Sequence, residues 1–254
     1  MQKKRTNSPY LKNDSKEDLP IRLNKFIANA GACNRREADE FIEQGLVKVN
    51  GKVVNSVGLK VNMDDRVELD GQRVYPGKKV FVLLNKPKDF SCQAGDKNDK
   101  TVLKLVEKAF ETKAVTLHSL GKTEKGLVVI SNDIQLAQNI SKGSNKIISL
   151  FKIEIDQPMK TDDFDTFSKG VKWKDELIKP IKMAYVDDNK NVLGLEINVN
   201  DSSILEQLFN SLGYKIVDLD RAMYNGLTKK NLARGQWRYL TEREVIQLRK
   251  NAKK

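Results

Sequence analysis

The sequence has few of the residues that build metal sites, disulfide frameworks and membrane spans. It contains one histidine, His118, and two cysteines, Cys33 and Cys92, that are far apart in the chain. Zinc sites need several cysteine or histidine ligands at short spacings, so we expect no metal ion and no small-molecule cofactor. No apolar run approaches the roughly 20 residues that span a bilayer, and residues 1–20 lack the apolar core of a secretory signal. These absences predict a reduced, cytoplasmic protein with no membrane partner.

Acidic residues are also in deficit. The 254-residue chain has 34 Asp and Glu against 46 Lys and Arg, a formal net charge of +12. Such a surface attracts phosphate backbones, because binding releases the counterions condensed on them. The composition therefore favours a nucleic-acid partner, with a merely solubilising surface charge as the alternative. The length allows one large domain or two smaller ones.

Residues 1–20 form a polar segment of mixed charge without hydrophobic periodicity. Such a segment cannot bury enough apolar surface to fold alone, so we expect a flexible arm. Its basic cluster, residues 3–5, could touch a nucleic acid, but a solvated tail is the preferred interpretation.

Residues 21–71 carry the pattern of a small domain with helices and short strands. Leu23, Phe26 and Ile27 recur at helical spacing, and Gly31 can end that helix. The pattern predicts a helix packed against whatever follows it.

Two local signals predict the next elements of this domain. Asn34 and Glu37 are spaced as in a capping box, which favours a second helix. Asn50-Gly51 separates two apolar-rich runs and is the pair that a type I′ hairpin turn favours. A helix pair followed by a hairpin and two more short strands is therefore expected.

This segment closely resembles the small RNA-binding domain named after ribosomal protein S-four. The resemblance covers essentially the whole domain, which we place at residues 21–75, and is carried by Arg22, Leu23, Lys25, Ala30-Gly31, Arg35-Arg36, Ala38, Gly45, Val47, Val49-Asn50-Gly51, Val61, Asp65 and Asp70-Gly71. In that family a basic helix face binds structured RNA. The resemblance implies phosphate contacts from Arg22, Lys25, Arg35, Arg36 and Lys48, although ordinary surface charge remains the alternative.

A polar connector with Pro76-Gly77 precedes a second predicted domain at residues 79–240, followed by a basic helix and tail at 241–254. Residues 126–130 (GLVVI) read as a buried strand, residues 215–219 as another short strand, and residues 101–110 as an amphipathic helix. Thr241 and Glu244 are spaced as in a capping box, which favours the start of the final helix. Helical and strand patterns mix without strict alternation, which favours an α+β fold.

The order of motifs in this region resembles the RsuA/RluB type of pseudouridine synthase, which modifies ribosomal RNA. The resemblance rests on FVLLNKPK, GLVVISND, LFKIEI, FNSLGYKIVDLDRAMYNGLT and RGQWRYLTEREV, together with the amino-terminal domain. It implies a bifurcated, largely antiparallel sheet with flanking helices, a ribosomal RNA or ribosomal particle as partner, and a monomer.

The catalytic residues of that family do not carry over. Its loop reads roughly Gly-Arg-Leu-Asp-x-x-Thr-x-Gly-Leu, and the nucleophilic aspartate falls on Gly121 and the arginine on Ser119. A glycine has no side chain with which to form a covalent intermediate. The family's tyrosine becomes Phe151, which lacks a hydroxyl. Its arginine-rich run becomes residues 201–207 (DSSILEQ), where the charge is reversed.

Two hypotheses follow from these losses. The preferred one is a catalytically inactive RNA-binding protein on this fold, acting on ribosomal RNA or ribosome assembly, with Arg234 and Arg238 as further RNA contacts. The alternative is an active pseudouridine synthase with an unorthodox carboxylate. Glu124, the nearest candidate, is expected to need a loop in a different register, and Glu111 lies before the loop.

Overall fold

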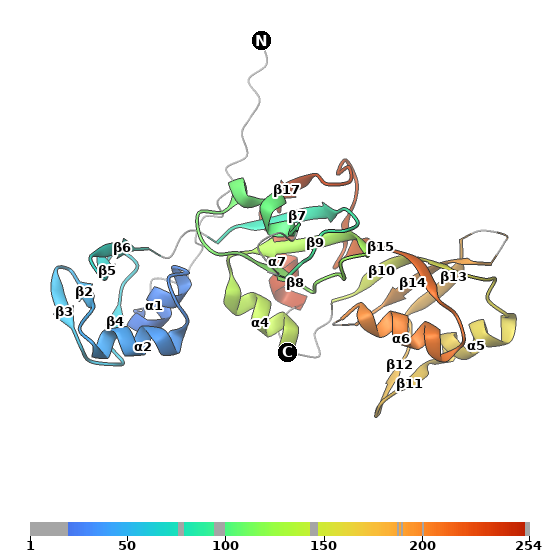
Figure 1. Ribbon diagram of the computed structural model, residues 1–254, viewed down its shortest axis with the longest axis horizontal. Coiled ribbons are helices and arrows are strands. Elements are labelled where there is room, and N and C mark those ends of the chain that lie inside the picture. The colour runs from blue at the N-terminus through green and yellow to red at the C-terminus, as the bar shows by residue number, and fades with distance from the viewer. Residues whose placement is uncertain are drawn as a thin grey trace, which may run out of the picture. The chain divides into compact units, whose positions relative to one another are not determined.

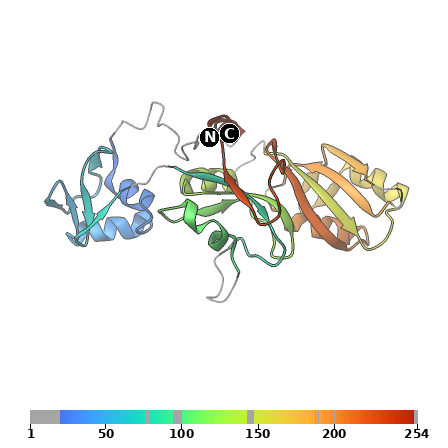
Figure 2. The ribbon, with the colours of Figure 1, turned by 90° about the horizontal axis from the view of Figure 1, so that it is seen from above.

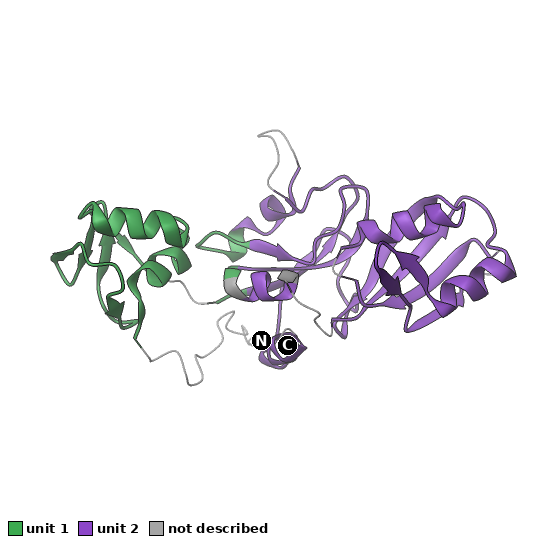
Figure 3. Cartoon of the chain, turned by 90° about the horizontal axis from the view of Figure 1, so that it is seen from below, with its two compact units in different colours: residues 1–80, 108–114, 132–134 green, residues 81–107, 115–131, 135–254 purple. Residues whose placement is uncertain are grey.

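The computed structural model describes residues 20–75, 79–93, 100–142, 147–186, 188, 190–199 and 201–251. The predicted arm therefore lies outside the described residues, apart from Pro20. The chain divides into two compact units (Figure 3). The first contains residues 1–80, 108–114 and 132–134, and the second contains residues 81–107, 115–131 and 135–254.

The first unit holds the helix pair and short strands that the sequence predicts (Figure 1). Its elements are β1 (Ile21–Arg22), α1 (Leu23–Asn29), α2 (Arg35–Glu43), β2 (Val47–Val49), β3 (Lys52–Val54), β4 (Lys60–Val61), β5 (Val67–Leu69) and β6 (Gln72–Val74). Four strands form an antiparallel sheet in the order β3-β2-β5-β6, and β1 pairs with β4. The core joins helix residues Leu23, Phe26 and Ile27 to strand residues Val47 and Val67.

The two local signals of this unit are confirmed. The Asn34 side chain accepts hydrogen bonds from the backbone of Arg36 and Glu37, and the Glu37 side chain accepts one from the Asn34 backbone. Asn50 and Gly51 both have positive φ, 51° and 81°, as the type I′ turn requires.

The second unit is built on a nine-stranded sheet. The strands of this part of the chain are β7 (Phe81–Lys86), β8 (Val115–Leu117), β9 (Lys125–Ser131), β10 (Ser149–Ile155), β11 (Val171–Trp173), β12 (Glu176–Ile178), β13 (Lys182–Tyr185), β14 (Val192–Ile197), β15 (Ile216–Tyr224), β16 (Leu227–Thr228) and β17 (Trp237–Tyr239). The helices are α3 (Val102–Leu105), the 3₁₀ helix η1 (Glu107–Ala109), α4 (Ile134–Lys142), α5 (Thr161–Lys169), α6 (Ser203–Ser211) and α7 (Glu242–Asn251).

The main sheet runs in the order β13-β14-β10-β15-β9-β7-β17, with β16 paired to β15 and β8 to β9. Adjacent strands of this sheet are antiparallel, except for β15 and β9, which are parallel and joined by only two residue pairs. This short junction divides the sheet into two halves, visible between β9 and β15 in Figure 2. Helices α5 and α6 lie side by side next to β14, and Phe167 packs on Phe209 between them. The predicted α+β class is confirmed.

Some predicted elements have different bounds. The helix expected over 101–110 is a single turn, α3, followed by the 3₁₀ helix η1, because the chain tightens at Val106. The short strand expected over 215–219 continues to Tyr224, since pairing with β10 extends along its length. The strand predicted at residues 126–130 is confirmed as β9, with its apolar side chains fully buried. No described helix is long and apolar enough to cross a membrane.

Candidate functional site

The loop between β8 and β9 lines a cavity of about 620 Å³ within the second unit. The other walls are the segment after β7 and the start of α6. The lining residues are Ser91, Cys92, Gln93, Thr116, residues 118–124, residues 201–203 and Glu206. This cavity therefore contains the two loop positions, Ser119 and Gly121, where the resemblance places catalytic groups.

A carboxylate lies beside the missing side chain of Gly121. A Cβ atom added to Gly121 would be 3.2 Å from the Glu124 carboxyl carbon. Glu124 Oε2 accepts hydrogen bonds from the Gly121 backbone N–H at 2.6 Å and from Ser202 Oγ at 2.5 Å. Glu124 is only 5% exposed. The expectation that Glu124 needs a changed loop register is wrong: a tight turn, with Glu124 N bonded to Gly121 O, brings it there directly.

The other three altered places, Ser119, Phe151 and residues 201–207, also lack the family's catalytic groups. Phe151 is 1% exposed in β10, so it belongs to the sheet's core and is not a base-stacking surface. Ser119 Oγ lies 2.7 Å from Thr116 Oγ1. From the former basic run, Asp201 and Glu206 line the cavity, so the charge that this helix end presents is negative.

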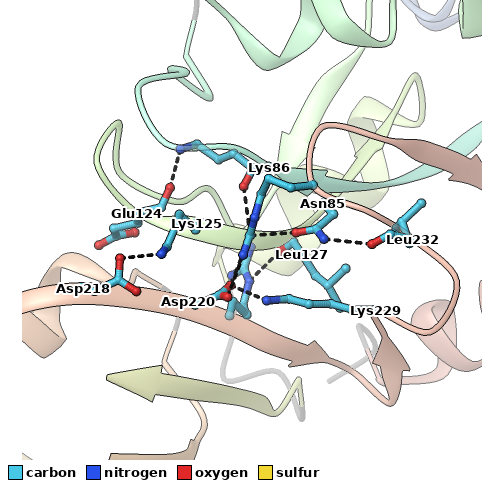
Figure 4. Close-up of polar contacts among 11 residues, drawn as sticks. Asn85, Lys86, Glu124, Lys125, Leu127, Asp218, Asp220, Lys229 and Leu232 are labelled. Atoms are coloured by element: carbon cyan, nitrogen blue, oxygen red, sulfur yellow. Dashed lines mark hydrogen bonds and ion pairs between the residues drawn. The ribbon is translucent and has the colours of Figure 1, made fainter. Parts of the chain in front are cut away.

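Lys86 binds the backbone of the loop between β8 and β9, a role that the sequence pattern did not reveal. Its side chain is fully buried, and Nζ donates to the carbonyl oxygens of Pro87, Lys122 and Glu124 at 3.3, 3.1 and 2.6 Å. Burial lowers the pKa of this amine. Figure 4 shows Lys86 reaching the backbone of Glu124.

Arg221 supports the same loop from β15 and was also missed. It is fully buried, and it donates to Leu127 O and His118 O, each at 2.7 Å. Its guanidinium lies 4.8 Å from the centre of the Tyr224 ring, which meets His118 edge-on. Burial, and then the nearby Arg221 charge, lower the pKa of His118 to about 4. His118 is therefore neutral at neutral pH and part of the loop's support. A single charged residue in an alternating strand gives no sequence signal for this role.

Arg234, a predicted RNA contact, takes part in a polar network near the junction of β9 and β15. It pairs with Asp220 at 2.8 Å and donates to Asn85 Oδ1 at 2.8 Å. Lys229 also pairs with Asp220, and Asn85 donates to Leu232 O at 2.9 Å (Figure 4). Burial opposes ionisation of Asp220, but the bonds from Arg234 and Lys229 outweigh it and lower its pKa.

Arg238 is similarly engaged, through two hydrogen bonds to Glu244 at 2.7 and 2.8 Å. Glu244 also forms the predicted capping box with Thr241, which is confirmed. Both arginines thus have carboxylate partners within the second unit, and their contact with RNA stays a prediction.

The basic residues of the first unit are spread over its helix pair and first strands. Arg35 and Arg36 are exposed in the first turn of α2, and Lys25 is half-buried in α1. Arg22 ends β1, and Lys48 lies in β2, both exposed. No described group of three or more His, Cys, Asp or Glu residues could hold a metal ion.

Comparisons with known proteins cover nearly the whole chain. The S4 domain family matches residues 21–67. An uncharacterized RNA pseudouridine synthase of Aquifex aeolicus (strain VF5) is 32% identical over 236 residues, which are 91% of this chain and 94% of the relative. Ribosomal large subunit pseudouridine synthase B of Bacillus subtilis (strain 168) is 28% identical over 90% of this chain and 95% of its own length.

A solved pseudouridylate synthase shares the fold, with a TM-score of 0.60 at 24% identity over 90% of this chain and 99% of that one. The resemblance inferred from the motifs is therefore confirmed along the sequence, with an amino-terminal S4 domain. The chain belongs to the RNA pseudouridine synthase family.

Proposed function

We propose that this chain is an RNA-binding member of its family that has lost catalysis and acts on ribosomal RNA or during ribosome assembly. The observation that carries the proposal is Gly121, which offers no side chain at the position of the family's nucleophile. A relative named for the large ribosomal subunit and another named for the small subunit support ribosomal RNA as the partner. A cytoplasmic monomer that needs no cofactor completes the proposal.

The surroundings of Glu124 argue against its replacing the nucleophile. In the segment that replaces the family's arginine-rich run, Ser202 donates to Glu124, and among the described residues no Lys or Arg pairs with the Glu124 carboxylate. A nucleophile needs a partner that activates it. Phe151 supplies no hydroxyl either, so the groups that would move protons are missing.

RNA binding rests on the S4 domain. Arg35 and Arg36 project from the first turn of α2, and Lys48 from β2, on a rigid frame with a complete core. Rigid basic side chains suit A-form RNA, which proteins recognise largely by backbone and shape. The net charge of +12 favours the same partner.

An active synthase is the second candidate, favoured by one observation. The Glu124 carboxyl carbon lies 3.2 Å from the place of a residue-121 Cβ, so a carboxylate is retained where the family has one. In the family pattern the aligned residue is threonine. A compensating exchange of aspartate to glycine and threonine to glutamate would keep one carboxylate in the cavity.

The purified chain, incubated with unmodified ribosomal RNA, separates the two candidates. Binding is followed by filter retention, and pseudouridine by chemical mapping of the same RNA. The proposal predicts retention without any new pseudouridine. Pseudouridine that forms with the wild type and disappears with Glu124→Gln would establish the second candidate, and absence of both binding and product would contradict the proposal.

A further inference from the structure

A two-stranded hairpin stands apart from the main sheet of the second unit. Among the described strands, β11 and β12 pair only with each other, and Figure 1 shows them as a separate ribbon that projects below α6. One face of the hairpin, with Val171, Trp173 and Ile178, is half-buried. The opposite face, where Lys172 pairs with Leu177 across the two strands, is exposed to solvent.

The hairpin and its flanks are rich in lysine. Residues 169–182 contain five lysines and only two acidic residues. All five lysine side chains are exposed, and they are Lys169, Lys172, Lys174, Lys179 and Lys182. Among the residues that the structure describes, none of the five forms an ion pair with a carboxylate. This part of the second unit therefore presents positive charge that the protein itself does not neutralise.

Other basic residues of the second unit are neutralised within it. Lys125, Lys229, Arg234 and Arg238 each form an ion pair with an aspartate or a glutamate. An RNA phosphate that binds one of these side chains has to compete with its carboxylate. The hairpin lysines require no such exchange, so they are better phosphate ligands than the two arginines that the sequence pattern singled out.

The tip of the hairpin holds one lysine in an unusual backbone conformation. Trp173 pairs with Glu176 across the strands, so Lys174 and Asp175 form a two-residue turn. Lys174 has a φ of 52°, a region that residues other than glycine, asparagine and aspartate rarely adopt. Its Nζ atom lies 6.0 Å from the centre of the Trp173 ring. The turn thus places a cation beside an indole at the end of the projecting ribbon.

We propose that the β11–β12 hairpin is a second RNA contact of this chain, with Lys172 and Lys174 bound to phosphates. The inference rests on the proposed RNA binding and adds a contact to those of the S4 domain. Lysine is a regular phosphate ligand but is depleted at protein interfaces. Of the large apolar side chains in residues 169–182, only Leu177 and Ile181 are exposed, which is too little for the apolar core of a protein interface. The charge therefore favours RNA as the occupant.

The first test measures the salt dependence of binding by the full chain to a transcript of unmodified ribosomal RNA, by filter retention. Lys172→Gln/Lys174→Gln removes two exposed charges and should reduce the slope of log affinity against log salt by up to about two. Lys215→Gln/Lys230→Gln is the matched control, because both lysines are exposed in the second unit outside the hairpin and the change in net charge is the same. The control should keep the wild-type slope, and circular dichroism should be unchanged in both variants.

The second test uses the fluorescence of Trp173. The chain has two tryptophans, so Trp237→Phe leaves Trp173 as the only one. When RNA saturates this variant, phosphates should draw the Lys174 ammonium away from the indole and change the emission of Trp173. The emission reports contact at the hairpin itself, whereas filter retention reports binding by the whole chain.

Three results would overturn this inference while RNA binding by the wild type stands. They are equal slopes for the wild type and Lys172→Gln/Lys174→Gln, an equal reduction in Lys215→Gln/Lys230→Gln, and Trp173 emission that does not change at saturation. A protein occupant would give the first and third of these results. A wild type that retains no RNA at all would contradict the proposed function as well as the hairpin contact.

Discussion

At the scale of single residues, the departures from the family pattern around Gly121 involve residues that contact one another. Gly121 leaves room for a neighbouring side chain, Glu124 fills part of it, and Ser202 donates a hydrogen bond to the Glu124 carboxylate. A family motif can show which side chain is missing, as it does for Gly121. It cannot show that a residue three positions later turns back into the same space, since that depends on the loop's turn and on a donor from α6.

Gly121→Asp should destabilise the chain and leave it inactive. The new Cβ would lie 3.2 Å from the Glu124 carboxyl carbon, and two carboxylates would share one buried space. We expect a loss of about 1–3 kcal/mol in the free energy of unfolding, measured by urea denaturation. The double variant Gly121→Asp/Glu124→Thr removes the crowding and should recover most of the loss. A single variant as stable as the wild type would show that Glu124 does not occupy this space.

His118 predicts a specific pH dependence of stability. Its pKa is about 4 in the folded chain, against an ordinary value of about 6.5. The unfolded chain therefore binds the extra proton between these values, and stability falls as the pH decreases from about 6.5 towards 4. Between pH 7 and pH 5, the free energy of unfolding of the wild type should therefore fall by about 2 kcal/mol more than that of His118→Asn. Asparagine suits the positive φ of 47° at this position. Urea denaturation of both proteins at pH 7 and pH 5 measures the two losses. Equal losses of unfolding free energy in the wild type and in His118→Asn would contradict the lowered pKa of His118.

At the scale of elements, the confirmed predictions are those that depend only on residues close together in the sequence. The capping boxes at Asn34 and Thr241 and the turn at Asn50-Gly51 need only local contacts, and each is present. The bounds of β15 and α3 depend on pairing and packing with distant segments, so the hydrophobic pattern placed these elements without fixing their lengths. The supporting roles of Lys86 and Arg221 were missed for the same reason.

The junction of β9 and β15 depends on Gly126. Its φ is 116°, and an added Cβ would lie 2.5 Å from the Arg221 backbone nitrogen. Since neither strand can move away without breaking the parallel pairs, we expect Gly126→Ala to cost about 3 kcal/mol or more, or to prevent folding. Gly213→Ala is the matched control: φ is also positive, 85°, but no atom lies within 4 Å, and the loss should be about 1 kcal/mol. Thermal unfolding of both variants compares them directly, and equal losses would contradict the role of the close approach.

At the scale of the whole molecule, the net charge of +12 and the S4 domain favour the same partner, a nucleic acid. The S4 domain carries exposed basic residues, whereas the cavity of the second unit is lined by acidic ones. Composition and motifs sufficed to predict the fold class, the family and the loss at Gly121. They could not predict the acidic cavity, because it combines residues about 80 positions apart, such as Glu124 and Ser202.

RNA affinity should fall steeply with salt and depend on the S4 domain. Each phosphate contact that is lost lowers the slope of log affinity against log salt by roughly one. Arg35→Gln/Arg36→Gln should therefore reduce this slope by up to about two. Arg243→Gln, an exposed arginine of α7 outside the predicted contacts, should leave the slope unchanged. Fluorescence anisotropy across a salt series measures both, and an affinity that does not change with salt would contradict the account.

The most direct test of the central claim compares pseudouridine, site by site, in ribosomal RNA from cells with and without this protein, together with its sedimentation with ribosomal particles. The account predicts identical pseudouridine maps while the protein sediments with a particle. A uridine that loses its modification when the protein is absent, and regains it on expression of the wild type but not of Glu124→Gln, would show that the chain is an enzyme that uses Glu124.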